Sequence, residues 1–309
     1  MTIYGADGSN GVILVTTKSG SNNKPLAISA RVNFGVATID KSTEFRMMSQ
    51  EQYLAVAKEA WTNAGNSLKT FPYQDNDYNS YSTTDTDWSK EYLGVGTNLY
   101  ADLSLTSGTK KTSNYVTGSY YKTDNTVKSD SQQRFSFRTR NSYDFTKWLR
   151  FNAQLSASYN TNNLFPLYRG FLETLPIFEP YLSDGSFRLY NKVYDEASGG
   201  WVMRKFTKNE VPAREANTNT QRSVMTSANF SVEAKIFDGL KFTSQYAIDY
   251  THSHEDIYYS RTTLSGMDSA GNPKGSSRRA DASYMNWTNV ERLNYDKRFA
   301  DRHNVSAYA

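Results

Sequence analysis

The amino-acid sequence predicts an all-β protein that forms an antiparallel transmembrane β-barrel. Three features of the chain support this fold class. Polar and apolar side chains alternate with a period of two, and the alternating segments are about 12 residues long, against about 5–6 in soluble sheets. The connections alternate between short and long, with short turns on one side and long loops on the other, as is typical of up-and-down outer-membrane barrels.

The composition indicates strands that are apolar on one face only. The 309 residues include 23 Tyr, 16 Phe and 5 Trp, yet the mean hydropathy is -0.70. A net charge of +4 is too small to indicate nucleic-acid binding, and the absence of cysteine excludes disulfides and Cys-based metal sites. The sequence predicts no transmembrane helix, because no apolar run of about 18 residues exists, and Met1 is not followed by a signal peptide.

The segments RFSFRTRNSYDF and WLRFNAQLSASYN predict the clearest hairpin. Mostly apolar side chains alternate with polar ones in both segments, and Thr146-Lys147 lies between them as a tight turn. A second hairpin has alternating segments at 224–234 and 240–250, joined by Asp238-Gly239, a strong hairpin dipeptide. Further strands are predicted at 28–38, 98–107, 113–122 and 282–296, with an incomplete strand from His303.

The polar faces of these strands carry charges that hydrocarbon would not tolerate. Each Arg or Lys near the middle of a lipid face costs about 2–4 kcal/mol. The polar faces are therefore expected to line a wet lumen, with charges at Arg138, Arg140, Arg150, Glu233, Lys235, Lys241 and Asp249. An interfacial aromatic girdle is expected beside three short turns, at Phe145 and Trp148, Phe237 and Phe242, and Tyr295 and Phe299.

Long loops are predicted at about 39–97 and 161–222. The first contains the one predicted helix, with Ser49 as N-cap, Gln52 completing a capping box and Gly65 ending it. Its apolar stripe predicts packing of the loop over the barrel mouth. Aromatic rings suit the apolar faces of sugars, so the candidate substrate contacts are Trp61, Trp88 and Trp201, with Tyr73, Tyr78 and Tyr81. The alternative is that these rings pack the loops themselves.

Other functional arrangements are less well supported. Gly5, Gly8 and Gly11 lack the spacing of a phosphate-binding loop, and a strand follows where a helix is required. A metal set of His252, His254 and Asp256 can be drawn at the end of a strand, but solvated side chains are the favoured interpretation. No catalytic motif is present, so the sequence predicts no enzyme, no cofactor and no metal site. On patterning alone, the alternative to a barrel is a soluble β-sandwich.

The beginning of the chain carries a more specific signal. IYGADGSNGVILVTTKSG, residues 3–20, resembles the end of the plug domain in TonB-dependent outer-membrane transporters of the SusC/RagA group. The matching positions are Tyr4, Gly5, Asn10, Gly11, Val12, Ile13, Thr16, Thr17, Lys18 and Gly20. Later segments, among them MSQEQYLAVAKEA and TDWSKEYL, are similar to the same group in the same order.

This resemblance implies that residues 1–20 are the C-terminal end of a plug domain. Residues 21–309 would then be the N-terminal part of an outer-membrane barrel with long extracellular loops. Because barrels of the group have about 22 strands, about nine strands make the chain an internal fragment. The implied function is TonB-dependent import of a large nutrient across the cell outer membrane, most often an oligosaccharide and sometimes a peptide.

The resemblance also implies partners. A SusD-like surface lipoprotein would cap the barrel, outer-membrane lipid would surround it, and the TonB complex would act through an N-terminal region that this chain lacks. Two alternative functions stay open: a TonB-dependent receptor for a siderophore or vitamin, and a soluble β-rich binding or adhesion module. The sequence does not identify the cargo, the residues that contact it or the oligomeric state.

Overall fold

A single antiparallel sheet of nine strands is the largest unit of the computed structural model, which describes residues 18–40, 47–165, 170–299 and 302–309. Each strand of the sheet pairs with the next one along the chain, except that a separate hairpin, β6-β7, lies between β5 and β8. The nine strands are β1 (Ala27–Ala37), β2 (Gly96–Gly108), β3 (Thr112–Asp124), β4 (Ser131–Asp144), β5 (Leu149–Asn163), β8 (Thr218–Phe237), β9 (Leu240–Tyr259), β10 (Ser276–Phe299) and β11 (His303–Tyr308).

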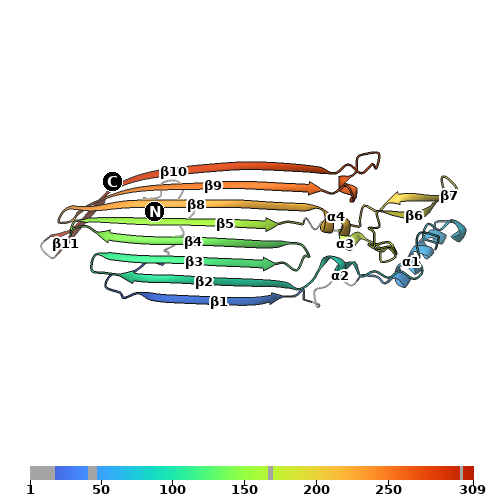
Figure 1. Ribbon diagram of the computed structural model, residues 1–309, viewed down its shortest axis with the longest axis horizontal. Helices are drawn as coiled ribbons and strands as arrows, with labels where there is room; N and C mark the ends of the chain where they lie inside the picture. The colour runs from blue at the N-terminus through green and yellow to red at the C-terminus, as the bar shows by residue number, and fades with distance from the viewer. Residues whose placement is uncertain (1–17, 41–46, 166–169, 300–301) are drawn as a thin grey trace.

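The predicted succession of short turns and long loops is confirmed. The short connections after β2, β4 and β8 all lie at one end of the sheet, which we call the turn end, and the long ones gather at the opposite loop end (Figure 1). Gly239 in the predicted Asp238-Gly239 turn has φ 91°, a conformation that favours glycine. In the described part of the chain no second large sheet packs on the first, so the structure does not support the β-sandwich alternative.

Strands β8, β9 and β10 are longer than the sequence predicts, at 20, 20 and 24 residues. Most of the additional length lies at the loop end. There the ladder continues, for example with His254 opposite both Arg222 and Asp281, although polar side chains now occupy both faces. Backbone pairing does not require an apolar face, so alternation of hydrophobicity marks only part of each strand.

The register gives the sheet one polar and one apolar face. Residues opposite one another in an antiparallel ladder share a face, and Arg138 pairs with Ser156, Arg150 with both Asp144 and Glu233. Following the ladder across the sheet places all the charges predicted for the lumen on one face, which confirms their shared orientation: Arg138, Arg140, Arg150, Glu233, Lys235, Lys241 and Asp249.

The apolar face is exposed. Phe34 is 69% and Trp287 61% accessible, and on β9 the apolar stretch runs from Phe242 to Tyr250, about 27 Å of strand. That length agrees with the apolar band of an outer-membrane barrel, about 25 Å tall. Four of the predicted girdle residues are also exposed near the turn end, Phe145, Trp148, Phe237 and Phe299. None of the helices in the described ranges has the length and apolar character needed to span a bilayer.

The buried core lies in the loops rather than under the sheet. One cluster is formed by Leu54, Phe71, Tyr81 and Ile177, and a second by Trp88, Tyr92, Phe206 and Val211. The elements of the loops are α1 (Gln50–Asn63), η2 (Leu68–Thr70), α2 (Trp88–Tyr92), α3 (Gly170–Glu173), β6 (Tyr190–Asp195), β7 (Gly200–Lys205), α4 (Val211–Ala216) and η3 (Leu264–Gly266), of which α1, α2 and α4 contain cluster residues. Figure 1 places them beyond the loop end of the sheet.

The predicted helix is α1. Ser49 caps it, and both hydrogen bonds of the predicted capping box with Gln52 are present. Gly65 follows the helix with φ 84°, as expected for a residue that ends one. The stripe of α1 buries Leu54 and packs Tyr53 and Trp61 against the first aromatic cluster, so this helix holds the first long loop together.

Candidate functional site

The polar face of β3 and β4 forms a wall of arginine and tyrosine side chains. Arg134, Arg138 and Arg140 lie on the same face of β4, with Ser136 between the first two, and Tyr121 and Tyr115 pair with the first and last of the arginines. The guanidinium carbon of Arg134 lies 5.7 Å from the centre of the Tyr121 ring. A concavity of about 710 Å³ lies along this face. Such a wall offers both charged hydrogen-bond donors and flat apolar rings to a solute that passes it.

The three candidate tryptophans occupy different environments. Trp88 is 2% exposed, stacks on Tyr92 and donates its indole N–H to the carbonyl oxygen of Leu175 at 3.0 Å. Trp61 is half-buried and donates to the carbonyl oxygen of Ser67 at 2.9 Å. Trp201 lies on β7, is 38% exposed and packs edge-on against Tyr194 at 5.7 Å. Of the three rings, Trp201 presents the most accessible surface.

Two of the three loop tyrosines named with them pack inside the loops. Tyr73 and Tyr81 contact one another at 5.7 Å between ring centres, and the Tyr81 hydroxyl donates to the carbonyl oxygen of Lys192 at 2.8 Å. Burial raises the pKa of Tyr81 and of Tyr92. Tyr78 has the guanidinium of Arg188 over its ring at 5.1 Å. These contacts join the first long loop to the second beyond the loop end of the sheet.

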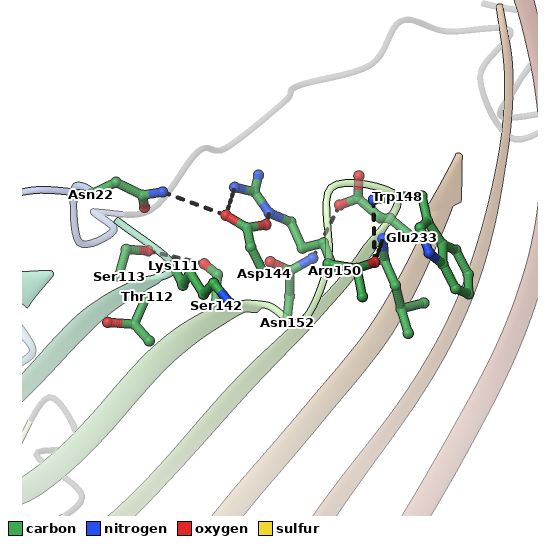
Figure 2. Close-up of polar contacts among 12 residues, drawn as sticks. Asn22, Lys111, Thr112, Ser113, Ser142, Asp144, Trp148, Arg150, Asn152 and Glu233 are labelled. Atoms are coloured by element: carbon green, nitrogen blue, oxygen red, sulfur yellow. Dashed lines mark hydrogen bonds and ion pairs between the residues drawn. The ribbon is translucent and has the colours of Figure 1, made fainter. Parts of the chain in front are cut away.

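A chain of ion pairs lines the polar face at the turn end (Figure 2). Asp144 accepts two hydrogen bonds from Arg150, at 2.6 and 3.0 Å, and one at 3.5 Å from Asn22. Glu233 accepts from Asn152 and from Lys241, each at 3.0 Å. Both carboxylates therefore have donors, as buried or partly buried charges require.

The segment that enters β1 is tied to this end of the sheet. Lys24 and Gly108 exchange backbone hydrogen bonds of 3.1 and 2.8 Å, and the amide of Asn23 donates to the carbonyl oxygen of Thr109 at 3.0 Å. A Cβ atom on Gly108 would lie 2.1 Å from the carbonyl oxygen of Ser21, so only glycine permits this approach. The predicted plug segment 1–20 falls almost wholly outside the described residues, which begin at Lys18.

One charged loop residue was not predicted. Glu210 lies between the second aromatic cluster and the ends of β8 and β9, and its backbone amide donates to the Tyr92 hydroxyl at 2.7 Å. It belongs to the long loop 161–222, in which no periodic pattern guides a prediction. The sequence signal that could have drawn attention to it is Pro212, because proline is favoured in the first turn of a helix and here lies in the first turn of α4.

Burial raises the pKa of Glu210 to about 6, against an ordinary value of 4.5, and the neighbouring Glu173 adds to the effect. Its stabilising contribution is therefore complete below pH 4.5 and is lost as the pH rises through about 6. We expect the loop around α4 to be protected a few-fold better from proteolysis at pH 5 than at pH 7.5. Asp77 and Asp195 have pKa values lowered by hydrogen bonds to Lys192 and to Ser198, so they stay ionised over this range.

The measurement is limited proteolysis of the purified protein at the two pH values, followed by mapping of the cleavage sites. Glu210→Gln should remove the pH dependence, because the amide does not titrate, whereas Glu51→Gln on the exposed face of α1 should retain it. If the wild-type loops are equally protected from proteolysis at both pH values, Glu210 does not stabilise them in a pH-dependent way.

His252 and His254 lie on the apolar face of β9, in its loop-end extension, beside acidic and hydroxyl side chains. The Nδ1 atom of His254 is 2.6 Å from Asp281 and its Nε2 atom 2.8 Å from Asp256, while His252 contacts Ser283 at 2.9 Å. Within the described ranges no group of three or more His, Asp and Glu side chains has an arrangement that could hold a metal ion.

Comparisons of sequence find relatives along the whole chain. It is 24% identical over 311 residues to the TonB-dependent receptor P26 of Formosa agariphila and 23% identical over 323 residues to the TonB-dependent receptor P3 of the same organism. These matches cover 99% and 98% of this chain but only 29% and 28% of the relatives. A match to the TonB-dependent receptor SusC of Bacteroides thetaiotaomicron, at 27% identity, covers 43% of the chain. No family model matches the sequence.

Comparisons of structure also find matches along almost the whole chain. The RagAB peptide importer in its closed-closed state matches 99% of this chain with a TM-score of 0.78 and 18% identity, and the open-open state matches it with a TM-score of 0.70. The matched region is 36% of the importer chain. The nine-stranded sheet therefore has the fold of part of an outer-membrane barrel, and the chain spans about a third or less of the proteins it resembles.

Proposed function

Because this chain belongs to the TonB-dependent receptors of the SusC/RagA type, which are outer-membrane proteins, we propose that it forms barrel wall in an importer of a large nutrient, an oligosaccharide or a peptide. The observation that carries the proposal is the division of nine long strands into an exposed apolar face and a charged face. The first suits lipid, and the second suits an aqueous passage. No chemical step is required of the protein.

The proposed partners follow from the relatives. The matched solved structure is the RagAB peptide importer, and the relatives found by sequence are TonB-dependent receptors. In the proposed complex a SusD-like lipoprotein delivers substrate to the loop end, and TonB supplies energy from the turn end. The loops that would contact the lipoprotein pack around the two buried clusters, so they offer it an ordered surface.

The proposed substrate contacts are the side chains that remain accessible. At the mouth these are the ring of Trp201 with its neighbour Tyr194, and on the wall they are the arginines of β4. Apolar ring faces suit both sugar rings and peptide side chains, so the wall itself does not separate the two. Trp88 and most of Trp61 instead support the loops from within.

Uptake by cells tests the proposal. A strain without the receptor, and a strain without TonB, should both lose accumulation of a labelled oligosaccharide or peptide that the parent strain takes up. Restoring the full-length receptor should restore uptake in the first strain only. Uptake that persists without TonB, or a receptor recovered in the soluble fraction in the absence of detergent, would overturn the proposal.

A further inference from the structure

A cavity of about 380 Å³ lies where the loop-end extremities of β8 and β9 meet α4 and the turn containing η3. This size falls within the range of small-molecule sites, about 300–1,000 Å³. Phe165, Pro212, Ile257 and Leu264 supply apolar wall, and Glu210 and Asn219 supply polar groups. A mostly apolar pocket with a few convergent polar groups is the usual form of a binding site.

Two hydrogen-bond acceptors at this cavity are unused. The Oε2 atom of Glu210 and the Oδ1 atom of Asn219 are buried and have no hydrogen-bond partner in the part of the chain that the structure describes. Buried acceptors without donors are rare in folded proteins and require an explanation, such as an absent ligand. Two of them at one cavity point to a ligand that is rich in donors.

Other polar side chains of the cavity already have partners. Asn217 accepts from the backbone amide of Ser260 at 2.8 Å and from Thr263 at 3.1 Å, and it donates to Ser265 at 2.9 Å. Asn209 donates to the carbonyl oxygens of Pro180 and Arg188, each at 2.9 Å. These bonds fix the walls, so the unused acceptors are a property of a well-ordered site rather than of a loose loop.

Among the described residues, no side chain forms an ion pair with the carboxylate of Glu210. The nearby ammonium of Lys208 contacts Glu173, and the guanidinium of Arg214 contacts Glu215 and the carbonyl oxygen of Glu91. Glu210 itself is fixed through its backbone, by Tyr92, at the start of α4. An ionised Glu210 therefore has only the more distant attraction of Lys208, whose ammonium is already paired with Glu173, and a ligand with a positive charge would supply a direct partner.

We propose that this cavity binds a protonated primary amine, with Glu210 and Asn219 accepting hydrogen bonds from its N–H groups. The terminal torsion of a Glu side chain is broad, so a small rotation of the carboxylate can present Oε2 to a ligand. An ammonium group has three donors and no acceptor, which complements two acceptors. Two substrate classes carry such a group, peptides at their amino terminus and amino sugars. The assignment rests on the proposed function and names the end of the substrate that is recognised.

Acetylated and free amines distinguish this proposal from general contact with substrate. Binding to the purified full-length receptor would be measured by calorimetry for triglycine and N-acetyl-triglycine, and for glucosamine and N-acetylglucosamine. Acetylation removes the charge and leaves the rest of each molecule. We expect at least one free amine to bind ten-fold or more tightly than its acetylated form, and which pair shows the difference identifies the source as peptide or amino sugar.

Variants locate the site. Glu210→Gln keeps the shape and removes the charge, and it should weaken binding of the free amine about ten-fold or more. Asn219→Leu removes the second acceptor and should also weaken binding. Glu196→Gln, in the exposed turn between β6 and β7, removes one charge from the same loops and should bind as the wild type does. Binding to the wild type should be stronger at pH 7.5 than at pH 5, because protonation of Glu210 removes the charge.

The proposal is overturned if acetylated and free forms bind equally, or if Glu210→Gln binds as the wild type does. A proteolysis pattern of Glu210→Gln that matches the wild type at pH 5 would show that the loops remain folded, and Asn219→Leu tests the cavity independently. Cellular uptake distinguishes failure of the amine site from failure of the proposed transport function. Loss of amine selectivity with TonB-dependent uptake intact overturns the amine site alone, whereas uptake without TonB overturns the proposed function.

Discussion

Replacement of Ile248 by arginine is expected to lower the free energy of unfolding of the full-length receptor by about 2–4 kcal/mol in a bilayer. Ile248 lies on the apolar face of β9, between Phe242 and Tyr250, and pairs with Ala228 and Trp287. A guanidinium at this position would meet hydrocarbon, and the cost is largest near the middle of the apolar band. The measurement is urea unfolding in lipid vesicles, followed by the heat-modifiable mobility of the folded barrel on gels.

The matched control is the neighbouring residue. Ala247 points to the polar face and pairs with Asn229 and Thr288, so Ala247→Arg adds the same side chain to the same strand on the opposite side. It should change the free energy of unfolding by much less. If both variants lose equal stability, the assignment of the two faces to lipid and water is wrong.

Replacement of Trp88 by alanine is expected to unfold the loops around the second buried cluster without unfolding the sheet. Removing a buried Trp from a packed core costs about 3–5 kcal/mol, and this ring contacts Tyr92 and Phe206 and donates to Leu175. The loss should appear as faster hydrogen exchange in α2 and in 206–217, while amides of β3 and β4 exchange as in the wild type.

Trp201→Ala is the control for this variant, because it removes the same side chain from an exposed position. It should leave hydrogen exchange in α2 unchanged and reduce uptake of substrate a few-fold, as expected if its ring contacts cargo. Normal exchange rates in Trp88→Ala would contradict the described second cluster, and normal uptake by Trp201→Ala would remove Trp201 from the proposed contacts.

The sheet could be predicted from the sequence because the alternation of side chains and the turn residues depend only on neighbouring positions in the chain. Alternation over the 135–159 hairpin and the Asp238-Gly239 dipeptide determine which side chains share a face and where the chain turns, without knowledge of distant contacts. The loop-end extensions of β8–β10 were underestimated because alternation is lost where strands leave the apolar band. His254, paired with residues of two neighbouring strands, lies in such an extension.

The packing of the two long loops could not be predicted in the same way. Trp88 and Trp201 belong to the same residue type and both lie in loops, yet one is buried and the other exposed, because contacts such as that of Trp88 with Leu175 join segments 87 positions apart. The β6-β7 hairpin and Glu210 likewise depend on how the two long loops pack together. Only α1, with its local capping box, was predicted within these loops.

The hydrogen bonds that tie residues 22–24 to the turn end of the sheet have a mechanical consequence. Tension applied to the chain ahead of residue 18 would first meet the reciprocal Lys24–Gly108 hydrogen bonds and the Asn22 contact to Asp144. Each of these bonds contributes only about 1 kcal/mol, but the strand behind them is paired to β2 along its whole length. A pull on the upstream segment should therefore extend that segment only as far as β1, which stays paired with β2 in the sheet.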